Sequence, residues 1–178
     1  MITTQSPIGS GFGATTTADE VIRGIDLSGR TVIVTGGYSG IGLETTRVLS
    51  AAGATVIVPA RTPEKARANL AGLPRVEPGA LDLQDPASID AFARDFLASG
   101  RPLHLLIHSA GVMATPLARD RRGYESQFST NHLGHFQLAL GLMPALVQAG
   151  GARVVERVAH GRQVGPISRA GIINPSFL

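Results

Sequence analysis

The 178-residue sequence contains no cysteine and no tryptophan, and aromatic residues make up only 4% of it. The lack of cysteine excludes disulfide frameworks, zinc fingers and thiol nucleophiles. The scarcity of aromatic side chains argues against a base-stacking platform for nucleic acid. No apolar run reaches the roughly 18 residues that a membrane span needs, and residues 1–20 lack the basic start and apolar core of a signal peptide. We therefore expect a cytoplasmic protein with no membrane partner and no nucleic-acid partner.

Charge is also scarce and is unevenly distributed. Sixteen basic and thirteen acidic residues give a net charge of +3, and fifteen of the sixteen basic residues are arginine. Residues 1–150 contain twelve basic and twelve acidic side chains, whereas the last 28 residues contain four arginines and one glutamate. Because the basic excess is confined to the C-terminal end, it does not predict a nucleic-acid-binding face on the body of the protein.

What the sequence does contain is a regular alternation of apolar runs and helical patterns. Hydrophobic residues make up 43% of the chain, which is enough for the core of one domain. Strands are expected at Thr31–Thr35, Ala54–Val58, Val76–Leu83, Leu103–Ile107 and from Arg153, and helices at Ala18–Arg23, Gly40–Ala52, Pro63–Ala71, from Pro86 and at Tyr124–Ala149. Uniformly apolar strands that alternate with helices predict an α/β fold with a doubly wound parallel sheet of Rossmann type, its strands buried on both faces.

A glycine-rich segment separates the first expected strand from the helix that follows it. Gly36, Gly40 and Gly42 lie there in the order Thr35-Gly-Gly-Tyr-Ser-Gly-Ile-Gly42. Such a loop lets the backbone approach a pyrophosphate, with the N-terminus of the helix directed at the negative charge. A tight turn alone is the alternative interpretation, but the strand–turn–helix context favours nucleotide binding.

The T-G-x-x-x-G-x-G spacing of this segment resembles that of the short-chain dehydrogenase/reductase family. Three later segments resemble the family in the same order: Asp82-Leu83 its adenine-contacting Asp, His108-Ser-Ala-Gly111 its Asn-Asn-Ala-Gly, and Thr130–Phe136 the stretch with its catalytic Asn, here Asn131. The residues of these segments most resemble those of the retinol-dehydrogenase-like branch, and the resemblance covers roughly Asp26 to Val155. It implies a dinucleotide-binding Rossmann domain at 29–155, with an extended lead-in at 1–28 and an irregular basic tail at 156–178.

Arg61 follows the second expected strand, where dinucleotide-binding folds recognise the adenosine ribose. An acidic residue near this point binds the 2′-hydroxyl of NAD, whereas an arginine accommodates the 2′-phosphate of NADP. Val58-Pro-Ala-Arg61 offers a guanidinium and no carboxylate, which favours NADP(H) over NAD(H). A solvated surface arginine is the alternative. Asp82 likewise has an alternative role, since Asp often closes turns.

These motifs give one candidate site. The candidate catalytic residue is Asn131, and no metal site is expected, because His132 and His135 are three residues apart with no third ligand in view. His104 and His108 are expected to be hydrogen-bonded core residues. The candidate cofactor-binding residues are Gly36, Tyr38, Ser39, Gly40, Ile41, Gly42, Arg61, Asp82, Leu83, Ser109, Ala110 and Gly111.

The catalytic set that the resemblance implies is otherwise missing. In the family a Tyr acts as general acid/base, a Lys lowers its pKa and a Ser holds the substrate oxygen. The tyrosines here are Tyr38 and Tyr124 and the single lysine is Lys65, so no Tyr-x-x-x-Lys pair exists. The run after Val155, Glu-Arg-Val-Ala-His, lacks the expected serine, and Glu156 in a buried strand would be costly unless it is paired or lies at an exposed end.

Two functions therefore remain open. The resemblance implies an oxidoreductase that transfers hydride between NADP(H) and a small alcohol or carbonyl substrate. The alternative is a catalytically incompetent remnant that binds NADP(H). We interpret the chain as a truncated or frame-disrupted member whose sheet is incomplete at its C-terminal end. The resemblance also implies a homo-oligomer, which an incomplete fold disfavours for this chain.

Overall fold

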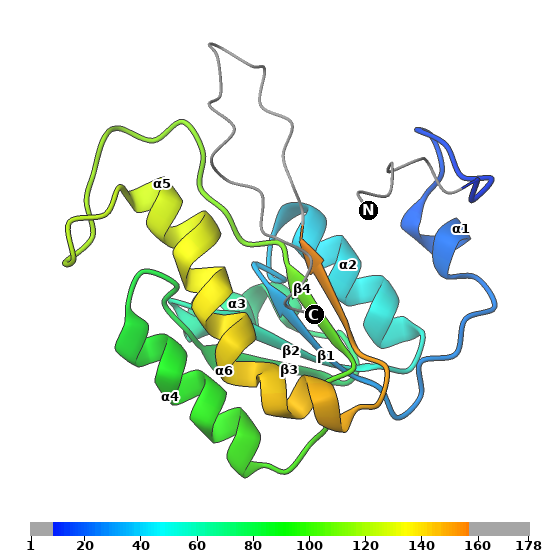
Figure 1. Ribbon diagram of the computed structural model, residues 1–178. Helices are drawn as coiled ribbons and strands as arrows, with labels where there is room; N and C mark the ends of the chain where they lie inside the picture. The colour runs from blue at the N-terminus through cyan, green and yellow to red at the C-terminus, as the bar shows by residue number, and fades with distance from the viewer. Residues whose placement is uncertain (1–8, 157–178) are drawn as a thin grey trace, which may run out of the picture.

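A single parallel sheet forms the centre of the computed structural model, which describes residues 9–156 (Figure 1). The strands lie in the order β3-β2-β1-β4-β5, and all four neighbouring pairs are parallel. Their bounds are β1 (Thr31–Thr35), β2 (Thr55–Ala60), β3 (Val76–Ala80), β4 (Leu105–His108) and β5 (Arg153–Glu156). The expected doubly wound α/β fold is confirmed, with β1 and β4 at the point where the strand order reverses.

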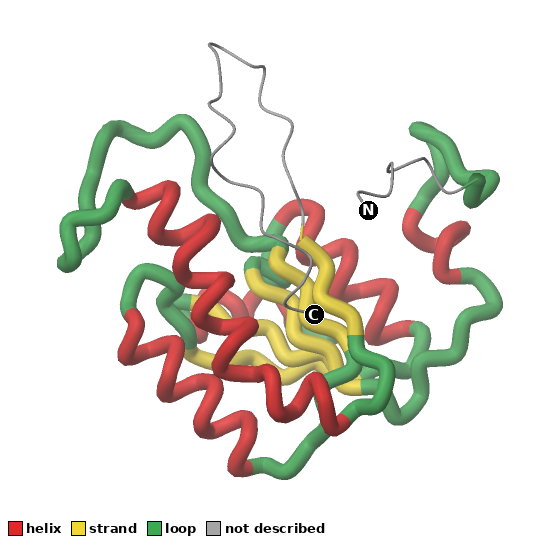
Figure 2. Tube along the Cα trace, viewed as in Figure 1, coloured by secondary structure: helices red, strands yellow, loops and turns green. Residues whose placement is uncertain are grey.

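Helices cover the sheet on both faces (Figures 1 and 2). On one face lie α2 (Gly40–Ala51) and α3 (Pro63–Leu70), and on the other lie α4 (Pro86–Ala98) and α6 (His135–Gln148). The short α1 (Ala18–Ile22) packs against α2, where Asp19 forms an ion pair of 2.6 Å with Arg47. None of the helices among residues 9–156 is long and apolar enough to cross a membrane.

The helix expected at Tyr124–Ala149 is divided into three segments. A short α5 (Ser126–Phe128) runs into the π-helical η1 (Ser129–Gly134), which continues directly into α6. The π turn adds one residue per turn to the ladder and shifts the register of the side chains, a feature that is often found at functional sites. It contains Asn131. The apolar pattern of the sequence gave no sign of this turn.

The core consists of two apolar layers separated by the sheet. Alternate residues of β1 point to opposite faces, so Val32 and Val34 pack with α2 while Ile33 packs with α4 and α6. All five residues of β1 are buried. The expectation of strands buried on both faces therefore holds at the centre of the sheet.

That expectation is wrong at the two edges of the sheet. β3 is only partly buried and contains Pro78, a residue that edge strands tolerate because one row of their backbone groups is unpaired. All four residues of β5 are exposed, and its main contacts are with β4. An apolar run alone does not report how many neighbours cover a strand. Of the tail expected at 156–178, only Glu156 lies within the described residues.

Candidate functional site

A cleft opens at the carboxyl ends of β1, β2 and β4, on the side of the sheet where open α/β folds bind ligands. Eleven of the twelve candidate cofactor-binding residues line it: Gly36, Tyr38, Ser39, Ile41, Gly42, Arg61, Asp82, Leu83, Ser109, Ala110 and Gly111. The twelfth, Gly40, lies between two lining residues, and Asn131 does not line the cleft itself but hydrogen-bonds the lining residue Val112. The structure thus brings segments from four loops to one cleft.

Gly36 makes the turn out of β1 and requires the absence of a side chain. Its φ is +67°, and a Cβ built there would lie 2.8 Å from the Cα of Ala110. Gly42 is similarly constrained, because a Cβ there would collide with the carbonyl oxygen of Gly36. The two glycines therefore let three segments approach one another closely. These are the loop after β1 (residues 36–39), the loop after β4 that begins at Ser109 (the β4 loop) and the start of α2.

The N-terminus of α2 faces the cleft without a capping side chain. Ser39 is the N-cap residue, yet its side chain makes no capping hydrogen bond. The backbone N–H groups of the first turn of a helix have no partner within the helix, and the helix dipole adds positive potential there. This end of α2 therefore has the donors and the polarity that suit a phosphate group.

Thr35, the last residue of β1, fixes the position of the β4 loop. Its buried hydroxyl accepts hydrogen bonds of 3.1 Å from the backbone N–H groups of both Ser109 and Ala110. These two residues line the cleft. Thr35 also lines it and was not among the candidate residues, although its place at the start of the glycine motif was a signal that could have identified it.

The side chain of Asn131 is fully engaged by the backbone of Val112. Its Oδ1 accepts from the Val112 N–H at 2.9 Å, and its Nδ2 donates to the Val112 carbonyl at 2.8 Å. The side chain therefore joins η1 to the loop after β4. Gly134 in the same turn packs so tightly that a Cβ would collide with the Leu83 carbonyl, so η1 is also fitted against the loop after β3.

Arg61 and Asp82 come from the ends of β2 and β3. The Arg61 side chain is exposed, and none of the ion pairs within residues 9–156 includes it. The Oδ1 of Asp82 accepts from the Gln84 N–H at 2.9 Å, while the Asp82 N–H donates to the Ser88 hydroxyl. Asp82 thus closes a local turn, which was the alternative role for it, and it does so while lining the cleft.

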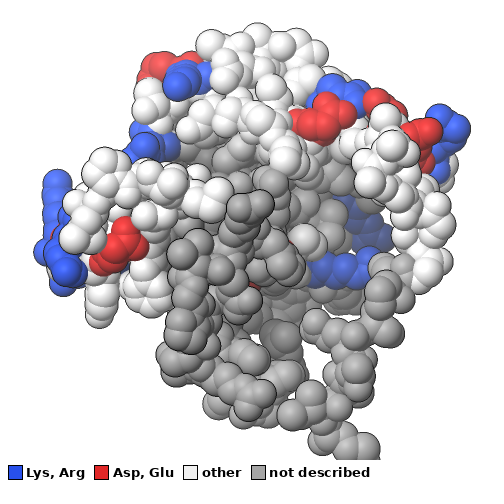
Figure 3. Space-filling model, turned by 90° about the horizontal axis from the view of Figure 1, so that it is seen from above, with Lys and Arg blue, Asp and Glu red and all other residues white. Residues whose placement is uncertain are grey.

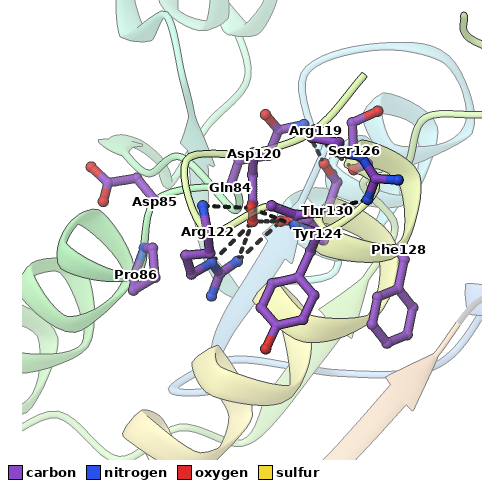
Figure 4. Close-up of polar contacts among 12 residues, drawn as sticks. Gln84, Asp85, Pro86, Arg119, Asp120, Arg122, Tyr124, Ser126, Phe128 and Thr130 are labelled. Atoms are coloured by element: carbon purple, nitrogen blue, oxygen red, sulfur yellow. Dashed lines mark hydrogen bonds and ion pairs between the residues drawn. The ribbon is translucent and has the colours of Figure 1, made fainter. Parts of the chain in front are cut away.

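A buried carboxylate orders the loop that leads into α5 (Figure 4). Asp120 accepts hydrogen bonds from Ser129 and Arg122, both at 2.7 Å, and from two backbone N–H groups. Burial alone would raise the pKa of Asp120, but these hydrogen bonds lower it to about 2. Nearby, Gln84 donates to the hydroxyl of Thr130 at 2.9 Å, and both residues line the cleft. This network holds η1 beside the loop after β3, and the sequence motifs did not reveal it.

Two histidines stack beneath the β4 loop. His108 and His135 are 4% and 3% exposed, and their ring centroids lie 4.4 Å apart. Burial lowers the pKa of both, and for His108, with the added effect of His135, to about 3. The expected core position of His108 is confirmed, but the expected hydrogen bond is wrong. Its ring nitrogens have no hydrogen-bond partner among the described residues, although Glu156 Oε1 lies 3.4 Å from Nδ1. His104 does have one, since its Nδ1 accepts from the Thr31 N–H.

No group of three or more metal-ligating side chains occurs among residues 9–156. His132 is exposed and stacks between Phe128 and Phe136. On the face seen in Figure 3, most basic side chains lie beside acidic ones rather than in a patch of one sign.

Comparison with known proteins agrees with this geometry. The model of the short chain dehydrogenase family matches residues 30–166. The chain belongs to the short-chain dehydrogenase/reductase family. It is 48% identical over 147 residues to a Streptomyces lividans protein named "Probable oxidoreductase", covering 79% of this chain and 48% of that one. It is 39% identical to mouse retinol dehydrogenase 11, covering 80% and 47%.

The fold of the family is also found among solved structures. A metagenomic short-chain oxidoreductase in complex with NADP matches with a TM-score of 0.66 and 30% identity, covering 80% of this chain and 67% of that one. The chain spans about half the length of the curated relatives that it matches. Within its 178 residues, Tyr38 lines the cleft, Tyr124 lies just before α5, and the single lysine, Lys65, is exposed on α3.

Proposed function

We propose that the cleft binds NADP(H), with Arg61 as the residue that recognises the 2′-phosphate. The observation that carries this proposal is that Arg61 lines the same cleft as the uncapped start of α2. A guanidinium that is not neutralised by a neighbouring carboxylate is free to form a bidentate contact with a phosphate. A family relative with NADP bound supports the choice of cofactor.

The other residues of the cleft fit the remaining parts of such a cofactor. Gly36 and Gly42 allow a tight turn here, and the space around Gly40 is open, so the backbone of the α2 N-terminus would be accessible to a pyrophosphate. Asp82 and Leu83 lie at the end of β3, on the side where the adenine would bind. Ser109, Ala110 and Gly111 line the same cleft from the loop after β4 and would contact the bound cofactor there. The bound cofactor would supply or accept the hydride that the family's reactions transfer.

Hydride transfer between NADP(H) and a small alcohol or carbonyl compound is a second candidate function, favoured by the membership in the family. A phenol with a pKa near 10 needs a nearby cation before it can act as a base at neutral pH. The 178 residues contain no Tyr-x-x-x-Lys motif. For this polypeptide we therefore propose binding of NADP(H) without turnover, and an assay against a panel of aldehydes and ketones separates the two functions.

Titration of the full chain with NADPH and NADH, followed by the fluorescence of the reduced nicotinamide, tests the binding proposal. Arg61→Ala removes a charged hydrogen-bond donor, which typically contributes about 1.5–3 kcal/mol. We expect a roughly 10- to 100-fold loss of NADPH affinity and little change for NADH. The matched control is Arg94→Ala, since Arg94 lies on α4 outside the cleft and is also exposed.

Two results would overturn this function. The first is an equal loss of NADPH and NADH affinity in Arg61→Ala, which would show that Arg61 does not recognise the 2′-phosphate. The second is failure of the parent chain to bind either dinucleotide. Turnover well above the rate without protein would instead establish the second candidate function.

A further inference from the structure

His135 is buried at the start of α6 and forms hydrogen bonds through both nitrogens of its ring. Nδ1 lies 3.1 Å from the carbonyl oxygen of Asn131, one turn earlier in the helix. Nε2 lies 2.9 Å from the hydroxyl of Thr35, at the end of β1. The ring thus bridges the π-helical turn and Thr35 of β1, whose hydroxyl binds the backbone of the β4 loop.

The chemistry of the partners determines which nitrogen carries the proton. A carbonyl oxygen only accepts, so Nδ1 must carry the hydrogen. In a neutral ring Nε2 then accepts from the Thr35 hydroxyl. Thr35 has one hydrogen to donate and two lone pairs, and the lone pairs accept from the N–H groups of Ser109 and Ala110. Every donor and acceptor in this His135–Thr35 hydrogen-bond chain is then satisfied.

The opposite tautomer leaves groups unmatched. With hydrogen on Nε2, three donors would compete for the two lone pairs of Thr35, and the bare Nδ1 would face the Asn131 carbonyl. The Thr35 hydrogen would turn to the Ile107 carbonyl, which lies 3.4 Å away. An imidazolium ring would face the same excess of donors at Thr35. Among residues 9–156, the titratable groups on this side are His108, stacked on the ring from β4, and Glu156 beyond it from β5.

We propose that His135, as the neutral tautomer with hydrogen on Nδ1, is a positioning residue for dinucleotide binding. It orients the Thr35 hydroxyl and thereby fixes the backbone of Ser109 and Ala110 where they line the cleft. At the same time it ties the Asn131 turn to β1. The effect on the cofactor rests on the proposed binding of NADP(H), whereas the hydrogen-bond chain itself can be measured without any cofactor.

The tautomer can be read directly from long-range ¹H–¹⁵N correlation spectra of the full chain at neutral pH. We expect His135 to show a protonated Nδ1 and a bare Nε2, with its signals assigned by their loss in His135→Gln. A protonated Nε2, or a doubly protonated ring, would overturn the proposal.

Amide hydrogen exchange of Ser109 and Ala110 tests the positioning. In His135→Leu both amides are expected to exchange faster, while His132→Leu, which alters an exposed histidine three residues earlier, leaves them unchanged. His135→Gln keeps an acceptor for the Thr35 hydroxyl and should restore slow exchange. It also serves if the leucine variant does not fold. Unchanged exchange in His135→Leu, or failure of the glutamine to restore it, would contradict the proposal.

A double-mutant cycle tests whether the hydrogen bond between Thr35 and His135 contributes to cofactor binding. Thr35→Val and His135→Leu are each expected to weaken NADPH binding about 2- to 10-fold, the range for one hydrogen bond. Because both act through one hydroxyl, the double variant should lose little more than the weaker-binding single variant. Independent, multiplying losses would overturn the proposal. If the parent chain binds no dinucleotide, the proposed function fails while the tautomer and the amide exchange still decide the role of His135.

Discussion

β1 and β5 lie on either side of β4 in one parallel sheet, yet their environments are opposite. β1 reads Thr-Val-Ile-Val-Thr and is buried along its whole length, whereas β5 reads Arg-Val-Val-Glu and is exposed along its whole length. Both contain β-branched residues that favour strands. β1 is paired on both edges and packed under α2 on one face and under α4 and α6 on the other. The local sequence selects the strand, and the neighbouring layers determine its burial.

The carboxyl ends of the two strands differ in the same way. β1 ends in Thr35, whose buried hydroxyl forms hydrogen bonds with the loop after β4 and with α6. The end of β5 is a carboxylate, Glu156, that is 60% exposed and lies beside a neutral histidine. Of the two, only the β1 end contributes to the cleft. Four predictions sharpen this comparison, from the largest expected effect to the smallest.

Truncation of a core side chain in β1 should have the largest effect. Ile33 is 0% exposed, so Ile33→Ala leaves a cavity between the sheet and α6, and it should lower the free energy of unfolding by about 2–5 kcal/mol. Val154 in β5 is 44% exposed, and Val154→Ala should change it by about 0.5 kcal/mol or less. Urea unfolding of both variants measures the difference. Similar losses in the two strands would contradict the burial contrast.

The turn after β1 is the next most sensitive point. Gly36→Ala places a methyl group against the backbone of Ala110 at a φ of +67°, and it should cost about 1–3 kcal/mol and abolish measurable NADPH binding. Gly72→Ala is the matched control. Its φ is +85° and the space around it is open, so it introduces strain without a collision. Loss of binding in Gly72→Ala as well would show that backbone strain alone, rather than the contact with Ala110, disrupts the site.

Most of the fold was predictable because it depends on short-range patterns. The bounds expected for β1 agree with the structure, and α2, α3 and β2 differ by one or two residues. Glycine spacing placed the loop and the helix start, since both depend on backbone freedom that only glycine supplies. These elements needed no knowledge of what lies next to them.

The remainder depends on contacts between distant segments. The π turn at η1 contains two residues with long-range contacts: Asn131 hydrogen-bonds Val112, and Gly134 packs closely against Leu83. The local hydrophobic periodicity of the sequence predicts neither contact. The hydrogen bonding of the Thr35 hydroxyl depends on its contact with His135, which lies 100 residues later in the sequence. The exposure of β5 depends on which helices cover it. The sequence motifs therefore predicted loops that line the cleft but not the groups that hold these loops in place.

The pH dependence of stability tests the effect of burial on His108, the last residue of β4, which lies between β1 and β5. The pKa of His108 is lowered by burial to about 3 in the folded chain, whereas an exposed histidine in the unfolded chain has a value near 6.5. Between these values the unfolded state binds more protons, so stability is fully present above pH 6.5 and is lost as the pH falls below it. The slope is at most about 1.4 kcal/mol per pH unit for this one group.

Urea unfolding at pH 7.5, 6.5 and 5.5 measures that slope before most carboxylates titrate. We expect a loss of about 1 kcal/mol between pH 6.5 and 5.5, with a smaller further loss from His135, whose pKa is also lowered by burial. His108→Asn removes the first contribution and should flatten the profile. A profile that keeps its slope in His108→Asn would assign the loss to another group.

The smallest effect is expected at the end of β5. Glu156 Oε1 lies 3.4 Å from Nδ1 of His108, a distance that suits an ion pair. Yet His108 is neutral at pH 7.5, because its pKa is lowered to about 3, so the carboxylate has no charged partner there. Glu156→Gln should therefore change the free energy of unfolding at pH 7.5 by about 0.5 kcal/mol or less, as for other exposed positions. A loss above about 1 kcal/mol, abolished in the background of His108→Asn, would show that His108 carries a charge in the folded chain, and that the exposed end of β5 is held by an ion pair.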